Sequence, residues 1–281
     1  MIDRRTLLAA AGALMLPKTV PGANRSSLDR PGGLLEAYLR LGASLDDRLV
    51  IWWMDGLRYG VVDARARLLF GMKVGMFHRY FRQSDGSARL AMFELTYYTD
   101  LATGELLETF DNPYTGETNR VRHVRLGPEI RHQTSAGLVV DESPLIRDYH
   151  SSLGPALVSG DELWIPGGVE AVIAFPKPDA PDIRLNHYTT VHGSVTEALD
   201  ETRASVPATL AFQNVIKWEP WMAMHGQPGH MMSRAAGRKL ASVDALPEDY
   251  LRIARRLHPA YIADPVGKLD KMVARIRSTS P

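Results

Sequence analysis

The sequence predicts an all-β fold, in which an antiparallel meander of strands forms a lipocalin-like closed or nearly closed barrel. Two observations support this expectation. Apolar and polar residues alternate with a period of two in runs rich in Val, Ile, Tyr and Trp, and short turn signals containing Gly, Asp or Asn separate these runs. Closure removes exposed strand edges, which favours a barrel over an open sheet. A two-sheet β-sandwich is the alternative.

In the first half of the chain, the predicted elements follow one another with short connections. A short helix is predicted from Leu34 to Leu41. Asp55-Gly56 is predicted to be a hairpin turn, and Gly71 and Gly75 are expected to form bulges. Strands are predicted at residues 48–54, 57–62, 68–82, 89–99, 105–110 and 118–125.

The second half of the chain is less regular. The stretch 127–160 is weakly patterned and is predicted to be a long connection, and 175–181 is a proline-rich loop within the sheet. We expect one barrel domain over residues 24–281, with a helical tail from about residue 245. Strands are predicted at 163–165, 169–175, 183–192 and 208–218, and helices at 248–257 and 268–277.

The segment 1–23 resembles an export signal. Arg4 and Arg5 precede a short apolar stretch, and the segment ends in small residues near Ala23. Paired arginines in this position are read by the twin-arginine export receptor. We therefore expect a twin-arginine signal peptide and a periplasmic or otherwise exported protein. The alternative is an amphipathic N-terminal helix of a cytoplasmic protein.

The composition excludes several classes of function. The 33 Lys and Arg residues nearly balance the 32 Asp and Glu residues, so no nucleic-acid partner is expected. The absence of cysteine rules out thiolate catalysis, iron–sulfur clusters and disulfides. No apolar run approaches the roughly 20 residues that span a bilayer, so no integral membrane segment is expected in the mature chain. The sequence also lacks dinucleotide, phosphate-loop and nucleophile-elbow motifs.

Polar side chains on the apolar face of a strand are candidate catalytic residues, because burying an unpartnered polar group costs on the order of a few kcal/mol. The alternation of residues places His123, His187, Tyr97 and Asn214 on inward faces. We expect His123 or His187 to act as a base and Tyr97 as an acid, while Asn214 orients a substrate oxygen. The alternative is that each is an ordinary core residue with a satisfied hydrogen bond.

The expected ligand-binding residues are mostly aromatic or sulfur-containing. Residues 218–232 hold two tryptophans, four methionines and two histidines, a composition suited to an adaptable apolar lid. No metal ligand is assigned. A zinc site formed by His225 and His230 with His123 or His187 is an alternative, although the spacing matches no short metal motif. The ligand-binding set comprises Trp52, Phe93, Phe212, Trp218, Trp221, Met224, His225 and His230.

Residues 95–117 and 121–124 resemble the domain-of-unknown-function family numbered 1838. The turn Asn112-Pro-Tyr-Thr-Gly-Glu117 is the most specific part of the resemblance, which covers most of the chain after the leader. Ser233 and Arg234 stand where the resemblance leads us to expect a Tyr-His pair. The family name implies no reaction. The resemblance therefore supports a single domain and says nothing about the activity. Further matching stretches lie at 218–224, 236–240 and 246–247.

Three functions from different classes are compatible with these residues. The leading interpretation is a cofactor-independent acid–base enzyme of the lyase, isomerase or hydratase type, acting on a hydrophobic, aromatic small molecule inside the barrel. The first alternative is a non-catalytic, lipocalin-like carrier of such a molecule. The second alternative is a His-ligated, metal-dependent hydrolase. The sequence leaves the oligomeric state open.

Overall fold

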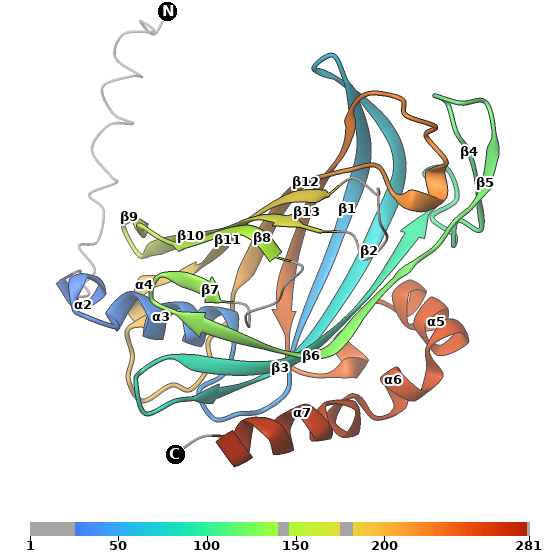
Figure 1. Ribbon diagram of the computed structural model, residues 1–281. Coiled ribbons are helices and arrows are strands. Elements are labelled where there is room, and N and C mark those ends of the chain that lie inside the picture. The colour runs from blue at the N-terminus through green and yellow to red at the C-terminus, as the bar shows by residue number, and fades with distance from the viewer. Residues whose placement is uncertain (1–25, 140–145, 175–181, 280–281) are drawn as a thin grey trace, which may run out of the picture.

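The computed structural model describes residues 26–139, 146–174 and 182–279 (Figure 1). The predicted export signal and the predicted loop at 175–181 lie outside these described residues. None of the described helices is long and apolar enough to cross a membrane.

One antiparallel sheet curls into a nearly closed barrel (Figure 1). Its strands follow the order β7-β6-β3-β2-β1-β13-β12-β11-β10-β8, and β9 pairs with β10. Pairing of β1 with β13 joins the two halves of the meander. Among the described residues, no backbone pairing joins β7 to β8, and the Tyr149 hydroxyl instead donates to the Leu138 carbonyl oxygen at 2.7 Å. The predicted nearly closed barrel is thus confirmed.

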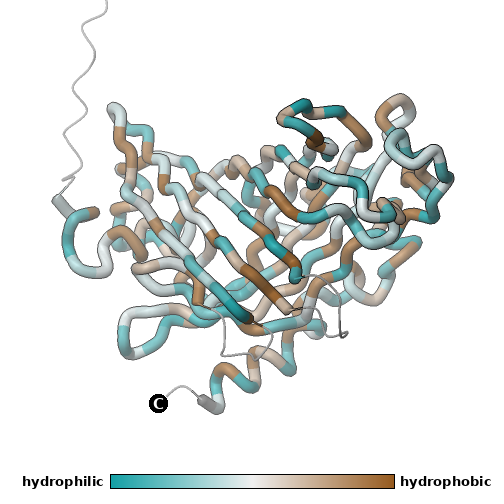
Figure 2. The backbone as a smooth tube through the Cα atoms, turned by 45° about the horizontal axis from the view of Figure 1, so that its top comes forward, coloured by the Kyte–Doolittle hydropathy of each residue, from teal (hydrophilic) through white to brown (hydrophobic). Residues whose placement is uncertain are grey.

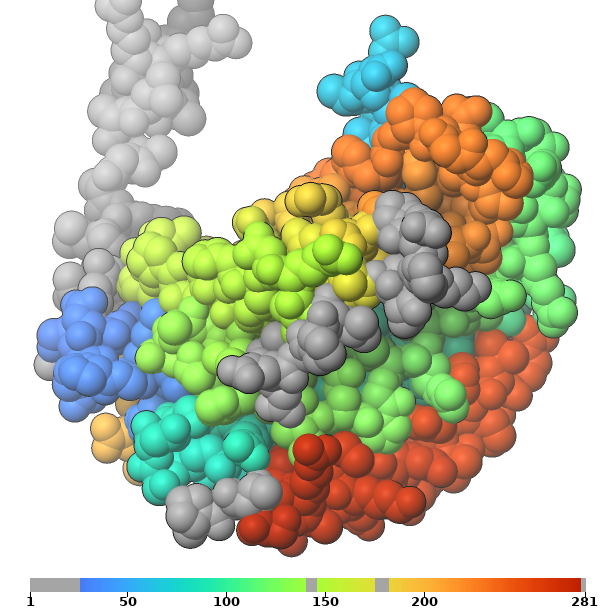
Figure 3. All heavy atoms as spheres, in the orientation of Figure 1, coloured from blue at the N-terminus to red at the C-terminus, as the bar shows by residue number. Residues whose placement is uncertain are grey.

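The barrel strands differ in length, from three residues in β7 and β9 to 18 residues in β2. Their bounds are β1 Val50–Val62, β2 Arg65–Arg82, β3 Ala88–Thr99, β6 Val124–Thr134, β7 Gly137–Val139, β8 Ile146–Leu153, β9 Leu157–Ser159, β10 Glu162–Ile173, β11 Ile183–Ser194, β12 Thr209–Ile216 and β13 His230–Leu240. A separate two-stranded sheet pairs β4 Thr109–Asp111 with β5 Thr118–Arg120. The tip of the β1–β2 hairpin projects beyond the rest of the molecule (Figure 3).

Helices cluster at the two ends of the chain. Their bounds are α2 Ser26–Asp29, α3 Gly33–Gly42, α4 Val195–Ala198, α5 Glu248–Leu257, α6 Pro259–Ala263 and α7 Pro265–Thr279, with short 3-10 turns η1 Pro220–Met222 and η2 Val243–Ala245. The predicted helix at 248–257 is therefore confirmed, and the predicted 268–277 helix lies within α7.

The predicted hairpin turn at Asp55-Gly56 is wrong, because β1 continues through it. The chain turns at Asp63 and Ala64, whose φ angles are 48° and 60°. Gly56 instead permits close approach of β13, since a Cβ there would lie 2.4 Å from the Arg234 carbonyl oxygen. The β1–β2 register shifts beside Arg58, not at either of the predicted bulge glycines.

Several strand predictions in the second half are also wrong. The stretch 127–160 is not a long connection, since β6, β7, β8 and β9 all cross it. The strands predicted at 163–165 and 169–175 are one strand, β10. The predicted lid segment contains the start of β13, which was missed because few of its residues are β-branched or aromatic. Of the strand predicted at 118–125, only its first residues pair in β5.

Hydrophobic and hydrophilic residues are interspersed along the strands (Figure 2). The strands β1, β2 and β3 carry buried apolar residues on both faces, so the core has two layers. The inner layer lines the barrel, with Trp52, Met54 and Phe70 among its buried residues. The outer layer on β1, β2 and β3 packs against α5 and α7. In this outer layer the Tyr250 hydroxyl of α5 donates to the Leu95 carbonyl oxygen at 3.1 Å.

Gly75 lies directly beneath Tyr250, and a Cβ at Gly75 would come within 2.2 Å of the Tyr250 hydroxyl oxygen. Replacing Gly75 with alanine is therefore expected to lower the free energy of unfolding by about 1–3 kcal/mol, because overpacking forces α5 away from the sheet. Urea denaturation would measure the loss. The double variant Gly75→Ala/Tyr250→Phe should recover part of it. An unchanged Gly75→Ala protein would contradict this packing.

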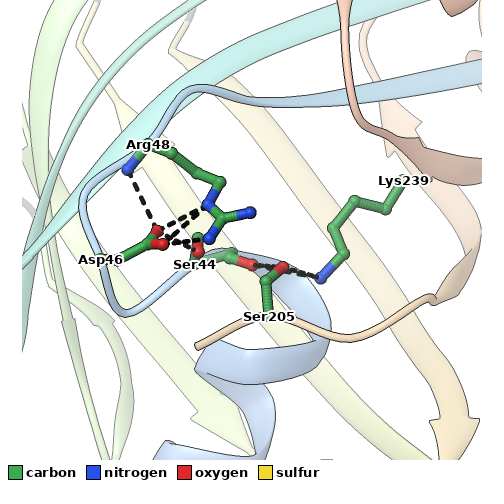
Figure 4. Close-up of polar contacts among 6 residues, drawn as sticks. Ser44, Asp46, Arg48, Ser205 and Lys239 are labelled. Carbon is green, nitrogen blue, oxygen red and sulfur yellow. Dashed lines mark hydrogen bonds and ion pairs between the residues drawn. The ribbon is translucent and has the colours of Figure 1, made fainter. Parts of the chain in front are cut away.

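The helix α3 is fastened at its C-terminal end by side chains from the barrel. The Lys239 ammonium of β13 donates to the carbonyl oxygens of Arg40 and Ala43, at 2.7 Å and 3.1 Å. It also donates to the Ser205 hydroxyl at 2.8 Å (Figure 4). The Trp52 indole donates to the Gly42 carbonyl oxygen at 2.7 Å. A cation at a helix C-terminus is stabilising, so α3 is held as a fixed wall of the barrel interior.

Candidate functional site

A cavity of about 410 Å³ lies inside the barrel. Since a water molecule takes up about 30 Å³ in the liquid, this space can hold a small organic molecule. Most of the wall is apolar, and it includes four methionines and the rings of Trp52 and Phe212. Side chains with polar groups are the minority at the wall. They are Tyr38, Arg58, His78, Tyr80, Glu94, Thr96, Arg131, Gln133, Ser152, His187, Thr189, Asn214, Glu219 and Ser233.

Four of these polar residues form a row across neighbouring strands, which we call the polar row. His187 of β11 pairs with Asn214 of β12, Asn214 pairs with Ser233 of β13, and Ser233 pairs with Arg58 of β1. Neighbouring strands lie about 4.8 Å apart, so the four side chains stand side by side on the inner wall. The pairing register brings together residues from distant parts of the chain.

Arg58 is the charged member of the polar row and is only 6% exposed. Its Nη2 donates to the Tyr98 hydroxyl at 2.8 Å and to Glu219 Oε1 at 3.0 Å. Tyr98 in turn donates to the same Glu219 oxygen at 2.9 Å. The charge of Arg58 is therefore compensated, but its Nε and Nη1 groups have no hydrogen-bond partner among the described residues.

His187 and Ser233 also carry unsatisfied polar atoms. Burial lowers the pKa of His187 to about 4, so its ring is neutral near neutral pH. The His187 Nε2 atom and the Ser233 hydroxyl are shielded from solvent and have no partner in the described structure. Asn214 Oδ1 accepts a hydrogen bond from the Ser233 amide at 3.1 Å, which fixes the amide side chain. The polar row thus offers several groups to a bound molecule.

The structure places four of the sequence-predicted site residues at the cavity wall. These are His187, Asn214, Trp52 and Phe212, and the inward orientation predicted for His187, Asn214 and Phe212 is confirmed. The inward orientation predicted for Tyr97 and Phe93 is wrong. Both side chains lie in the outer layer under the C-terminal helices, because the parity of β3 is opposite to the expected one.

Tyr97 and His123 lie together, but outside the cavity. The Tyr97 hydroxyl is 2.8 Å from His258 Nδ1, and the Tyr97 and His123 rings are 6.0 Å apart. His123 follows β5 instead of lying within a strand, and its Nδ1 accepts a hydrogen bond from the Tyr98 amide at 3.1 Å. Burial lowers the pKa of His123 to about 4. The inward orientation predicted for His123 is therefore also wrong.

The remaining predicted binding residues lie at and beyond one end of the barrel. Trp221 packs against Tyr98, with ring centroids 6.1 Å apart, and Met224 accepts a hydrogen bond from Asn112 at 3.3 Å. The rings of Trp218 and Tyr114 are 5.1 Å apart. None of Trp218, Trp221 and Met224 is among the residues that line the cavity.

The alternative zinc site is not assembled. His225 is exposed and contacts Glu117 at 3.2 Å, whereas His230 pairs with Val61 at the start of β13. The described ranges contain no group of three or more His, Asp and Glu side chains that could hold a metal ion.

Sequence reasoning missed Arg58, Tyr98, Glu219 and Ser233. Arg58 has the same parity as Trp52 and Met54, so the alternation would have found it had the strand been continued through Asp55-Gly56. Tyr98 was expected on the outer face, because the inward positions predicted for β3 were wrong by one residue. Glu219 lies in no strand, so no periodicity signals its inward direction.

The family model described as "Protein of unknown function (DUF1838)" matches residues 46–138 and 186–277. The chain belongs to this family. No curated protein matches the chain. The matched segments of the DUF1838 chain contain all four residues of the polar row, together with Tyr98 and Glu219. The unmatched segment between them contains β8, β9 and β10.

Replacing Ser233 with alanine tests whether its hydroxyl is truly unpartnered. An unsatisfied buried hydroxyl is destabilising, so Ser233→Ala is expected to raise the free energy of unfolding by about 1 kcal/mol. Ser205→Ala is the matched control. Its hydroxyl donates to the Ala43 carbonyl oxygen at 2.8 Å, and its loss should be destabilising. Urea denaturation compares the two variants. Equal destabilisation by both would show that Ser233 has a partner in the free protein.

Proposed function

We propose that the DUF1838 chain binds a small, largely apolar molecule inside the barrel, with an oxygen-bearing end of that molecule on the polar row. The observation that carries this proposal is Arg58, a buried arginine at the cavity wall with two nitrogen groups that find no acceptor in the part of the chain that the structure describes. Each unsatisfied buried polar group costs about 1–3 kcal/mol. A ligand oxygen that accepts hydrogen bonds from Arg58 would offset this cost.

The rest of the wall supports an apolar body for the ligand. Phe212 and Trp52 present aromatic surface, and methionine side chains adapt to ligands of irregular shape. A mostly apolar wall with a few polar groups is the usual composition of small-molecule sites. The polar groups then set the orientation of the ligand, with its oxygen toward Arg58 and its apolar part toward Trp52.

Acid–base catalysis is the second candidate function, and His187 is the observation that favours it. Its ring is neutral near neutral pH and its Nε2 atom is free to accept a proton. Arg58 and Asn214 stand in the same row and would stabilise negative charge on a substrate oxygen. His187 would then be the base, without Tyr97 or His123, which lie outside the cavity.

Native mass spectrometry of the full chain, purified from its own cells, tests the binding proposal. We expect one small molecule per chain, which is lost in the variant Arg58→Met but retained in the exposed-site control His225→Gln. A wild-type chain that never carries a ligand would contradict the proposal.

The same experiment separates a carrier from an enzyme. A carrier returns the released ligand chemically unchanged after incubation. An enzyme converts it, and conversion should stop in His187→Gln while binding persists. Conversion that continues unchanged in His187→Gln would exclude His187 as the base.

A further inference from the structure

A second cluster of side chains lies on the cavity wall away from the polar row, and its histidine, His78, has no role in either proposed function. His78 of β2 pairs with Met92 of β3, and Met76 precedes His78 by two residues on the same inner face. Trp52 of β1 pairs with Met76. All four side chains line the cavity. We call these four residues the methionine–histidine cluster.

His78 brings an unpartnered ring nitrogen to this part of the wall. It is 6% exposed and lines the cavity, and its Nε2 atom is buried with no hydrogen-bond partner among the described residues. A buried polar atom without a partner is costly, so an ion that meets it would offset that cost. Histidine ring nitrogens are common ligands of transition metals.

The register places two thioethers beside this ring nitrogen. Directly opposed residues on antiparallel strands have Cβ atoms about 4.5–5.5 Å apart, which applies to His78 and Met92. Residues two apart on one strand are separated by about 6.6 Å, which applies to His78 and Met76. The long, flexible methionine side chains can therefore place both sulfur atoms near one point in front of Nε2.

We propose that His78, Met76 and Met92 bind one copper(I) ion. Soft thioether ligands select copper(I), whereas the hard cations magnesium and calcium require oxygen ligands. The ring of Trp52 beside Met76 would stabilise the cation through its π face. Glu94 pairs with Met76, lines the cavity and accepts a hydrogen bond from Thr96 at 2.7 Å, whereas Lys239 and Arg131 are the positive groups that act on His78. This site does not depend on the binding of an organic ligand at the polar row.

Anaerobic titration of the full chain with copper(I), in competition with a chromophoric copper(I) chelator, tests the site. We expect one ion per chain. Met92→Leu and Met76→Leu should each weaken copper(I) binding by at least about tenfold. Removing a residue that only hydrogen-bonds a metal ligand already costs about 10- to 100-fold in affinity, and these variants remove a ligand itself. These swaps nearly conserve volume, so the fold should survive. Met54→Leu and Met72→Leu, in the same cavity but outside the cluster, are the matched controls and should bind as the wild type.

Methyl NMR shows which methionines hold the ion, because the chain has 11 of them. With silver(I) as a redox-inert probe and ¹³C-methyl methionine, the Met76 and Met92 signals should shift and the Met54 and Met72 signals should not. Binding that shifts the methionines of residues 222–232 instead would overturn the proposal. So would zinc binding in preference to copper(I), or equal affinity in Met54→Leu and Met92→Leu.

Discussion

Replacing Arg58 with methionine is expected to abolish retention of the cavity ligand and to lower the free energy of unfolding by about 3–5 kcal/mol. Both effects follow from the position of the guanidinium. Its Nε and Nη1 groups are hydrogen-bond donors without an acceptor among the described residues. It also neutralises Glu219, whose side chain is only 17% exposed. Without Arg58, Glu219 is left as a poorly solvated carboxylate. Native mass spectrometry measures the ligand, and urea denaturation measures the stability.

The double variant Arg58→Met/Glu219→Gln separates the two effects. It removes both charges, so most of the lost stability should return. The ligand should remain absent, because the donors of Arg58 are still missing. If the ligand returns together with stability, Arg58 only holds the fold, and the oxygen-binding role assigned to it is wrong.

The second large effect is a loss of stability in mild acid caused by His187. Burial lowers its folded-state pKa to about 4, whereas the unfolded chain protonates it near pH 6.5. Its contribution to stability is therefore complete above about pH 6.5 and is lost as the pH falls toward 4. Between about pH 7 and pH 5 the expected loss is about 1–2 kcal/mol from this residue.

Urea denaturation of wild type and His187→Gln at the two pH values measures this effect. The variant should lose less stability on acidification by the amount assigned to His187. His225→Gln is the control, since this ring is exposed beside Glu117 and should leave the pH dependence in place. An identical pH dependence in His187→Gln and wild type would show that the ring is already protonated or solvated in the folded state.

The sequence predicts the barrel because most strands keep a strict alternation. On β11 and β12 this alternation places His187, Thr189 and Asn214 inward, and the structure confirms it. On β3 it fails, because both faces are apolar. Phe93 and Tyr97 face the C-terminal helices while Met92 and Tyr98 face the barrel, and a strand buried on both sides has no parity signal.

The polar row could not be assembled from sequence for a different reason. Three of its members lie on the consecutive strands β11, β12 and β13, and Arg58 joins them only because β1 pairs with β13, a contact between residues that are far apart in the chain. The sequence of β13 is rich in small and basic residues. The small residues Gly237 and Ala235 lie where the backbone of β1 approaches closely. Propensity therefore gave no signal for Ser233.

A crystal structure of the full chain purified from its own cells tests most directly whether the barrel holds a ligand on the polar row. We expect electron density for one small molecule in the barrel cavity, with an oxygen atom within hydrogen-bond distance of Arg58 and an apolar part toward Trp52. A cavity that contains only water, with Arg58 and Ser233 hydrogen-bonded to it, would contradict the proposed function.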